Sequence, residues 1–166
     1  MNIYQYNVIL DSAGRNALAM DSVAEYPYLD RLDSPDRTAR LMREAFGLHT
    51  RAEEYLYLVC ANAKCIPIGF FELSHGTYNM TLASPREALV RALLCGAACM
   101  QLVHNHPSGD TTPSSADNQM TKEMREAAGL VGIEFCDHII IGGDRYYSYR
   151  EAGALGKARE CGQAQT

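Results

Sequence analysis

The stretch that decides both fold and chemistry is residues 101–117, QLVHNHPSGDTTPSSAD. Its apolar start predicts the end of a buried strand, and His104 and His106 follow two positions apart. In an extended segment, residues i and i+2 point to the same side, so both imidazoles can face one point in space. A loop rich in proline and glycine comes next, and Ser114 to Asp117 predicts the start of a helix. Asp117 therefore lies in the first helical turn, and the loop can fold it back toward the histidines.

Two neutral imidazoles and one carboxylate are three protein ligands for a divalent transition metal. Zinc with three protein ligands and one open position is the catalytic arrangement, whereas structural zinc sites are closed by four ligands. The pattern therefore predicts one Zn²⁺ per chain, bound by His104, His106 and Asp117. The alternative is a surface loop that happens to contain two histidines. The strand-to-loop placement, the His-x-His spacing and the acid at a helix start favour the metal site.

The same residues resemble the motif of a known family. His104-x-His106-Pro107, followed by Ser114-x-x-Asp117, resembles the JAMM motif of the JAB/MPN metallopeptidase family. The longer string from His104 to Asp110 resembles the RadC branch of that family. Ser84-Pro85-Arg86-Glu87 and residues 137–142 (DHIIIG) share this resemblance, which extends over most of the chain.

The resemblance implies an activity and assigns residues to it. JAMM enzymes hydrolyse a peptide or isopeptide bond with a zinc-activated water, so the implied partner is a peptide or protein substrate. Their general base is a glutamate upstream of the histidines, before a short apolar strand. Glu54 matches that position, and Glu53 is the alternative. Ser114 matches the hydroxyl that donates to the oxyanion of the tetrahedral intermediate. It could instead cap the helix, although Ser115 is also available for capping.

The implied fold is an α/β (α+β) domain of JAB/MPN type, with the layered architecture also found in cytidine deaminases. In such a domain a mixed, partly antiparallel sheet is flanked by helices. Patterns along the sequence agree with this fold class. The predicted helices are a capped helix from Ser34, a central buried helix from Ser84 to about Met100, and a helix that begins at residues 114–117 and runs to about Ala128, where Gly129 ends it. The predicted strands are a hairpin of 55–60 and 65–73, a short strand 78–82, a strand 101–106, and strands 133–141 and 145–149.

The length of 166 residues predicts a single domain with a core of its own. The RadC-like JAB/MPN domain is expected to occupy residues 34–153. Residues 1–33 are expected to form an N-terminal extension that packs on the domain and contains a strand at 3–10. Residues 154–166, which are rich in glycine, alanine, glutamine and charge, are expected to be a disordered tail.

Composition bounds the partners and the compartment. Fifteen basic and twenty acidic residues give a net charge of −5, and the scattered basic residues argue against nucleic acid as a partner unless folding gathers them into a patch. No stretch approaches the roughly 18 apolar residues of a membrane helix. The N-terminus lacks the basic start and the cleavage site of a signal peptide, which predicts a cytoplasmic protein. The six cysteines form no Cys-x-x-Cys pair and are expected to be small buried hydrophobes.

A rival interpretation remains open. JAB/MPN domains also occur as catalytically silent modules that bind partners, and RadC-like domains have been associated with DNA repair. The complete ligand set favours metal binding over silence. Three other polar residues have open roles: Asn105 is expected to brace the loop, Asp110 could orient a ligand histidine, and His138 is either a satisfied core histidine or a neighbour of the site.

Overall fold

The protein is described here by a computed structural model that covers residues 1–27, 29–76 and 83–155. Within these residues, seven strands form one mixed sheet in the order β2-β1-β4-β3-β5-β6-β7. Its pairs are antiparallel except β1–β4 and β5–β6, which are parallel. The elements are β1 (Asn2–Leu10), β2 (Asn16–Glu25), α1 (Pro35–Glu44), the 3-10 turn η1 (Leu48–Thr50), β3 (Glu54–Ala61), β4 (Pro67–Gly76), α2 (Pro85–Leu94), β5 (Cys99–Asn105), α3 (Ser115–Leu130), β6 (Glu134–Gly142) and β7 (Arg145–Ser148). The predicted fold class is confirmed.

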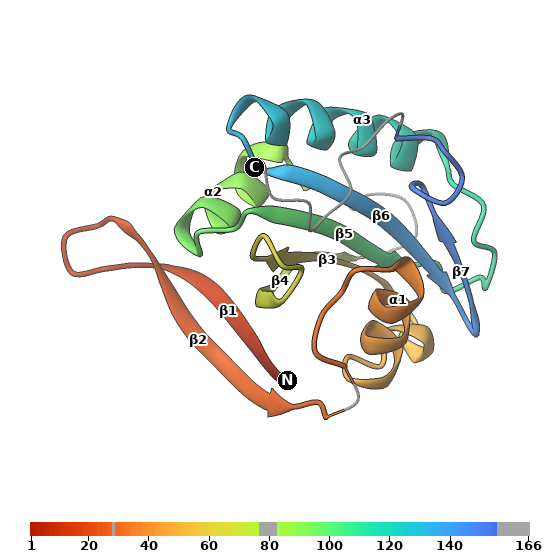
Figure 1. The fold of residues 1–166 in the computed structure, drawn as a ribbon, viewed down its shortest axis with the longest axis horizontal. Coiled ribbons are helices and arrows are strands. Elements are labelled where there is room, and N and C mark those ends of the chain that lie inside the picture. Colours follow the sequence, from red (N-terminus) through yellow and green to blue (C-terminus); the bar gives the residue numbers. More distant parts are fainter. Residues whose placement is uncertain (28, 77–82, 156–166) are drawn as a thin grey trace.

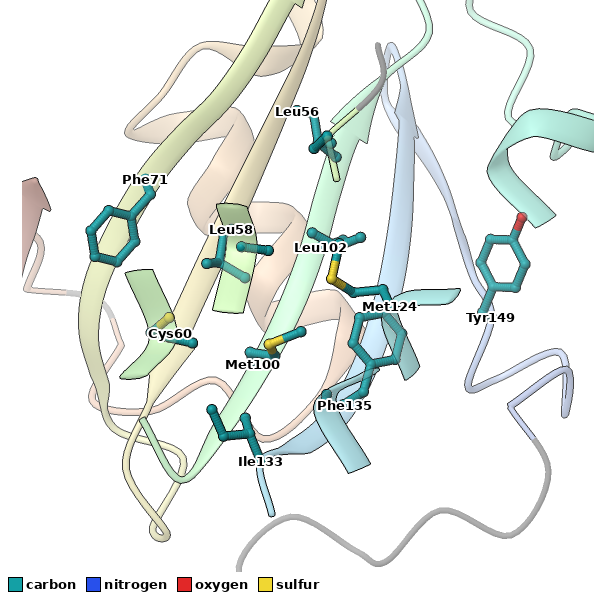
Figure 2. Close-up of a cluster of buried hydrophobic side chains, with 14 of the residues drawn as sticks. Leu56, Leu58, Cys60, Phe71, Met100, Leu102, Met124, Ile133, Phe135 and Tyr149 are labelled. Carbon is teal, nitrogen blue, oxygen red and sulfur yellow. The ribbon is translucent and has the colours of Figure 1, made fainter. Parts of the chain in front are cut away.

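Helices cover both faces of the sheet, with α2 and α3 on one side and α1 on the other (Figure 1). Successive strand residues point to opposite faces, so each central strand supplies both layers of the core. Figure 2 shows one of these layers, to which β3 contributes Leu56 and Leu58, β5 contributes Leu102, and α3 contributes Met124. The alternate residues of the same strands join a second cluster with α1. Every residue of β5 is buried, which makes this strand the centre of the molecule.

The predicted central helix after Ser84 differs from the observed one. Ser84 does cap α2, but the helix ends at Leu94, because Gly96 adopts the left-handed conformation at φ 68° and turns the chain toward β5. Leu93 and Leu94 are 55% and 41% exposed, so α2 is a surface helix rather than a buried one. The prediction that this helix continues to about Met100 was therefore wrong.

The N-terminal residues form a hairpin. The predicted strand at 3–10 is confirmed as β1, and β2, which the sequence did not predict, pairs with it along its length. The hairpin extends away from the rest of the molecule at the edge of the sheet (Figure 1), where Gln5 of β1 pairs with Phe70 of β4.

Two predictions fall largely outside the described residues. The short strand at 78–82 lies there, as do residues 156–166 of the predicted tail. Leu155, near the start of that tail, is buried in the core. Among the described residues, no helix has both the length and the apolar character needed to cross a membrane.

Candidate metal centre

Three predicted ligands meet where β5 ends and α3 begins. The Nε2 atoms of His104 and His106 lie 3.0 Å apart. His104 Nε2 lies 3.2 Å from Asp117 Oδ1, and His106 Nε2 lies 3.6 Å from Asp117 Oδ2. One ligand atom from each residue falls within 4.8 Å of the others, in a group that could hold a metal ion. The prediction that strand spacing and a helix start would bring these residues together is confirmed.

The carboxylate of Asp117 is held by the start of its own helix. Ser114 is the N-cap of α3, and its hydroxyl accepts a hydrogen bond from the Asp117 backbone amide. In return, Asp117 Oδ2 accepts hydrogen bonds from the Ser114 backbone amide at 2.7 Å and from the Ser114 hydroxyl at 2.6 Å. This reciprocal capping box fixes Oδ2 and directs Oδ1 toward His104. The cap is Ser114 itself, and Ser115, which the sequence offered for that role, is the first residue of the helix.

Backbone contacts fix the ring of His106. Its Nδ1 lies 2.6 Å from the carbonyl oxygen of Asp110. A carbonyl oxygen can only accept, so Nδ1 carries the hydrogen and the lone pair of the neutral ring is on Nε2, facing Asp117. The Asp110 side chain instead accepts hydrogen bonds from the Thr112 amide and hydroxyl. Asp110 thus orients His106, a predicted ligand, as the sequence suggested, but through its backbone carbonyl.

His138 contacts His104 through the ring nitrogen Nδ1 of His104. Its side chain is fully buried, and its Nε2 lies 2.8 Å from His104 Nδ1. Its Nδ1 lies 2.6 Å from the hydroxyl of Thr121 on α3. The ring of Tyr149 stacks on the ring of His138, with centroids 5.1 Å apart. Both interpretations of His138 are therefore correct, because it is a hydrogen-bonded core residue and it touches the candidate site.

The strand register distinguishes Glu54 from Glu53. Leu56 of β3 pairs with His104 of β5, and residues directly opposite each other in an antiparallel pair share a face of the sheet. Glu54 lies two positions before Leu56, so it shares that face with both histidines. Glu53 lies in the bend before β3 and is exposed, whereas Glu54 is half-buried.

Asn105 attaches this part of β3 to the site. Its side-chain carbonyl accepts from the backbone amide of Tyr55, and its side-chain amide donates to the backbone carbonyl of Glu53, both at 2.9 Å. Asn105 was expected to brace the histidine loop. Instead, it braces the start of β3 from both sides of Glu54 and thereby fixes that residue relative to the histidines.

Charges within the site shift its pKa values. Hydrogen bonding to Asp117 raises the pKa of His106 above its usual value of 6.5, against the effect of burial, and the charges of Asp117 and Glu54 raise it further. Burial would raise the pKa of Asp117, but hydrogen bonds to His104 and His106 outweigh it and hold that pKa well below its usual range. Burial, aided by the charge of His104, lowers the pKa of His138, whose ring is therefore neutral.

Comparison with known proteins agrees with this geometry. The family model described as RadC-like JAB domain matches residues 32–154. The chain belongs to this family. In this RadC-like JAB domain, β5 and α3 bring the three predicted ligands together.

Curated relatives of this RadC-like JAB domain carry the name UPF0758 protein. One from Clostridium acetobutylicum is 41% identical over 125 residues, which cover 75% of this chain and 54% of that protein. One from Thiobacillus denitrificans is 41% identical over 143 residues, covering 85% and 60%. One from Chlorobium luteolum is 34% identical over 148 residues, covering 84% and 66%. The chain thus spans about half the length of the first of these relatives.

Proposed function

We propose that this RadC-like JAB domain is a zinc-dependent hydrolase that cleaves an amide bond, peptide or isopeptide. The observation that carries the proposal is the convergence of three ligand residues with Glu54, a half-buried carboxylate on the same face of the adjacent strand. A metal site that only stabilises a fold does not require such a carboxylate. A hydrolytic site does, because a general base must take a proton from the attacking water.

The spacing of the donor atoms supports zinc. Four ligands at the corners of a tetrahedron, each about 2.0–2.1 Å from zinc, lie about 3.3 Å from one another. His104 Nε2 lies 3.0 Å from His106 Nε2 and 3.2 Å from Asp117 Oδ1, and both separations are close to that value. The second carboxylate oxygen, Oδ2, lies 3.6 Å from His106 Nε2. Two imidazoles and one carboxylate leave a fourth position for water. A zinc ion held there would supply an acidic water and polarise the substrate carbonyl.

The residues of the chain divide the remaining work. Glu54 accepts a proton from the attacking water, whose oxygen bonds to the carbonyl carbon. The C–N bond then breaks, and Glu54 gives the proton to the leaving amine, so the products are a carboxylic acid and an amine. Ser114 is the proposed oxyanion donor. Its hydroxyl has one hydrogen, which faces Asp117 Oδ2, so this role requires the hydrogen to rotate toward the substrate.

The test is hydrolysis by the zinc-loaded protein, with two neighbouring glutamates compared. Unstructured quenched-fluorescence peptides and peptides joined through a lysine isopeptide bond serve as substrates. We expect cleavage by the wild type, a loss of about 10²–10⁴-fold in kcat for Glu54→Gln, and near wild-type rates for Glu53→Gln. Equal losses in the two variants would exclude Glu54 as the specific base. Failure of the zinc-loaded wild type to cleave any of these substrates would favour the alternative, a silent or DNA-repair-associated binding module.

We also propose the domain division and the location that the sequence suggests. The RadC-like JAB domain occupies residues 34–153, close to the matched residues 32–154. Residues 1–33 pack on it as an extension whose hairpin continues the sheet. A cytoplasmic location, with a peptide or protein as the substrate, completes the proposal, and fractionation of cells tests the location.

A further inference from the structure

A series of buried polar atoms runs from α3 to the candidate metal ligand His104 and has no part in the proposed hydrolysis. The Thr121 hydroxyl lies 2.6 Å from the backbone carbonyl oxygen of Asp117 and 2.6 Å from His138 Nδ1. His138 Nε2 lies 2.8 Å from His104 Nδ1. His138 is fully buried and Thr121 is 4% exposed, so their polar atoms need partners within the protein. The Tyr149 hydroxyl also contacts Thr121, but it donates its hydrogen to Asn118 Oδ1 at 2.8 Å.

The donors in this series can be assigned from its first member. The Asp117 carbonyl oxygen can only accept, and two oxygens 2.6 Å apart without a hydrogen between them repel each other. The single hydrogen of the Thr121 hydroxyl therefore points to that carbonyl, and the hydroxyl oxygen accepts a hydrogen from His138 Nδ1. The neutral His138 ring then has its lone pair on Nε2, which accepts a hydrogen from His104 Nδ1. That leaves the lone pair of His104 on Nε2, the atom that faces His106 and Asp117.

We propose that Thr121 and His138 are positioning residues that hold His104 in the tautomer able to bind metal. The part that concerns His104 and zinc rests on the proposed function, whereas the hydrogen bonds of Thr121 and His138 belong to the metal-free protein as well. In the reverse arrangement, His138 Nε2 would donate to His104 Nδ1. His104 would then carry its hydrogen on Nε2, which would occupy the direction in which the metal binds.

The two ligand histidines are controlled by different means. His106 faces a backbone carbonyl, which can only accept, so its tautomer needs no further control. His104 faces an imidazole, which can either donate or accept. The Thr121 hydroxyl removes this ambiguity, because it is tied to the Asp117 carbonyl one helical turn before it. The same helix therefore supplies one metal ligand, Asp117, and sets the protonation of another.

The first test compares zinc affinity in Thr121→Val, Thr121→Ser and a matched control, Thr38→Val. Thr38 is also a buried helical threonine whose hydroxyl donates a hydrogen bond, here to Gln101 on the opposite face of the sheet. Loss of residues that orient a ligand histidine weakens metal binding by about 10–100-fold, which is the loss we expect for Thr121→Val in competition with a chromophoric chelator. Thr121→Ser and Thr38→Val should bind zinc as the wild type does. Equal affinities for Thr121→Val and Thr38→Val would overturn the inference.

The second test reads the tautomers in the wild type and needs no variant to fold. Long-range ¹H–¹⁵N correlation spectra of the metal-free protein at a pH of about 8, where ordinary histidines are neutral, distinguish Nδ1–H from Nε2–H rings. We expect His138 to carry its hydrogen on Nδ1, and an Nε2–H form of His138 would refute the inference. The two proposals fail separately, because a wild type with this tautomer but no affinity for zinc would contradict only the proposed function.

Discussion

A single methyl group at Gly142 should disturb the loop that carries His106. A Cβ built on Gly142, the last residue of β6, would lie 2.6 Å from the carbonyl oxygen of Gly109, 2.8 Å from its carbonyl carbon and 2.8 Å from Cγ2 of Thr111. All three distances are below any ordinary contact, and two of the three atoms are backbone. Gly142→Ala therefore requires the loop or the end of β6 to move.

Neighbouring hydrogen bonds resist that movement. The His106 amide donates to the carbonyl of Ile141 at 2.8 Å, and Arg145 Nη2 donates to the carbonyl of Gly109 at 2.8 Å. The loop is thus attached to the end of β6 on both sides of Gly142. Overpacking of this kind costs about 1–3 kcal/mol. For a chain of this size each 1 kcal/mol lowers Tm by about 2–4 °C. Displacement of Gly109 would also move the neighbouring Asp110 carbonyl, which orients the His106 ring, so zinc affinity should fall.

The matched control is Gly129→Ala in α3. No atom lies within 4 Å of a Cβ at Gly129, and the residue is inside a helix, where alanine is more stable than glycine by about 0.5–1 kcal/mol. Chemical denaturation should therefore give shifts of opposite sign for the two variants. An unfolding midpoint for Gly142→Ala equal to that of the wild type, with unchanged zinc affinity, would refute the steric argument.

Three further predictions concern the polar residues of the site. Asn105→Ala leaves the Tyr55 amide and the Glu53 carbonyl without their partner. It should therefore lower the free energy of unfolding, measured by denaturation, by about 1–3 kcal/mol. It should also reduce kcat, measured by steady-state kinetics, while zinc is retained. A protonated imidazole cannot bind metal, and the pKa of His106 is raised above 6.5. Zinc affinity, measured by chelator competition, should therefore already decline before the pH has fallen to about 6.5. An affinity that is constant down to about pH 6.5 would contradict this. Ser114→Ala should cost about 0.5–2 kcal/mol of stability as a lost helix cap, and a further loss of about 10²–10³-fold in kcat would support the oxyanion role.

The meeting of His104, His106 and Asp117 could be predicted from the sequence because its determinants are local. The spacing of His104 and His106 on a strand, and the placement of Asp117 in a first helical turn, follow from backbone geometry alone. The partners of Asn105 and His138 lie on other strands and on α3, and no local pattern identifies them. Asn105 alternates with the two histidines and so points to the other face of the sheet, but only the register with β3 shows what it meets there.

Tertiary pairing explains the elements that were missed. The segment 16–25 (NALAMDSVAE) is rich in residues that favour helices, and it becomes β2 only because β1 offers a partner along its length. Helix α3 passes through Gly129, which was expected to end it, and the turn occurs at Gly132 with φ 74°. A glycine signals a helix end only where the backbone adopts the left-handed conformation, and sequence does not reveal which of two nearby glycines does so.

The most direct test of the central claim is the zinc content of the purified protein, measured by elemental analysis of the wild type, His106→Ala and Glu54→Gln. We predict about one zinc per chain in the wild type, loss of zinc in His106→Ala, and retention in Glu54→Gln, because the first variant removes a ligand and the second changes only the proposed base. A wild type that neither carries zinc nor takes it up would contradict the account and identify the domain as a binding module that has kept the motif without the chemistry.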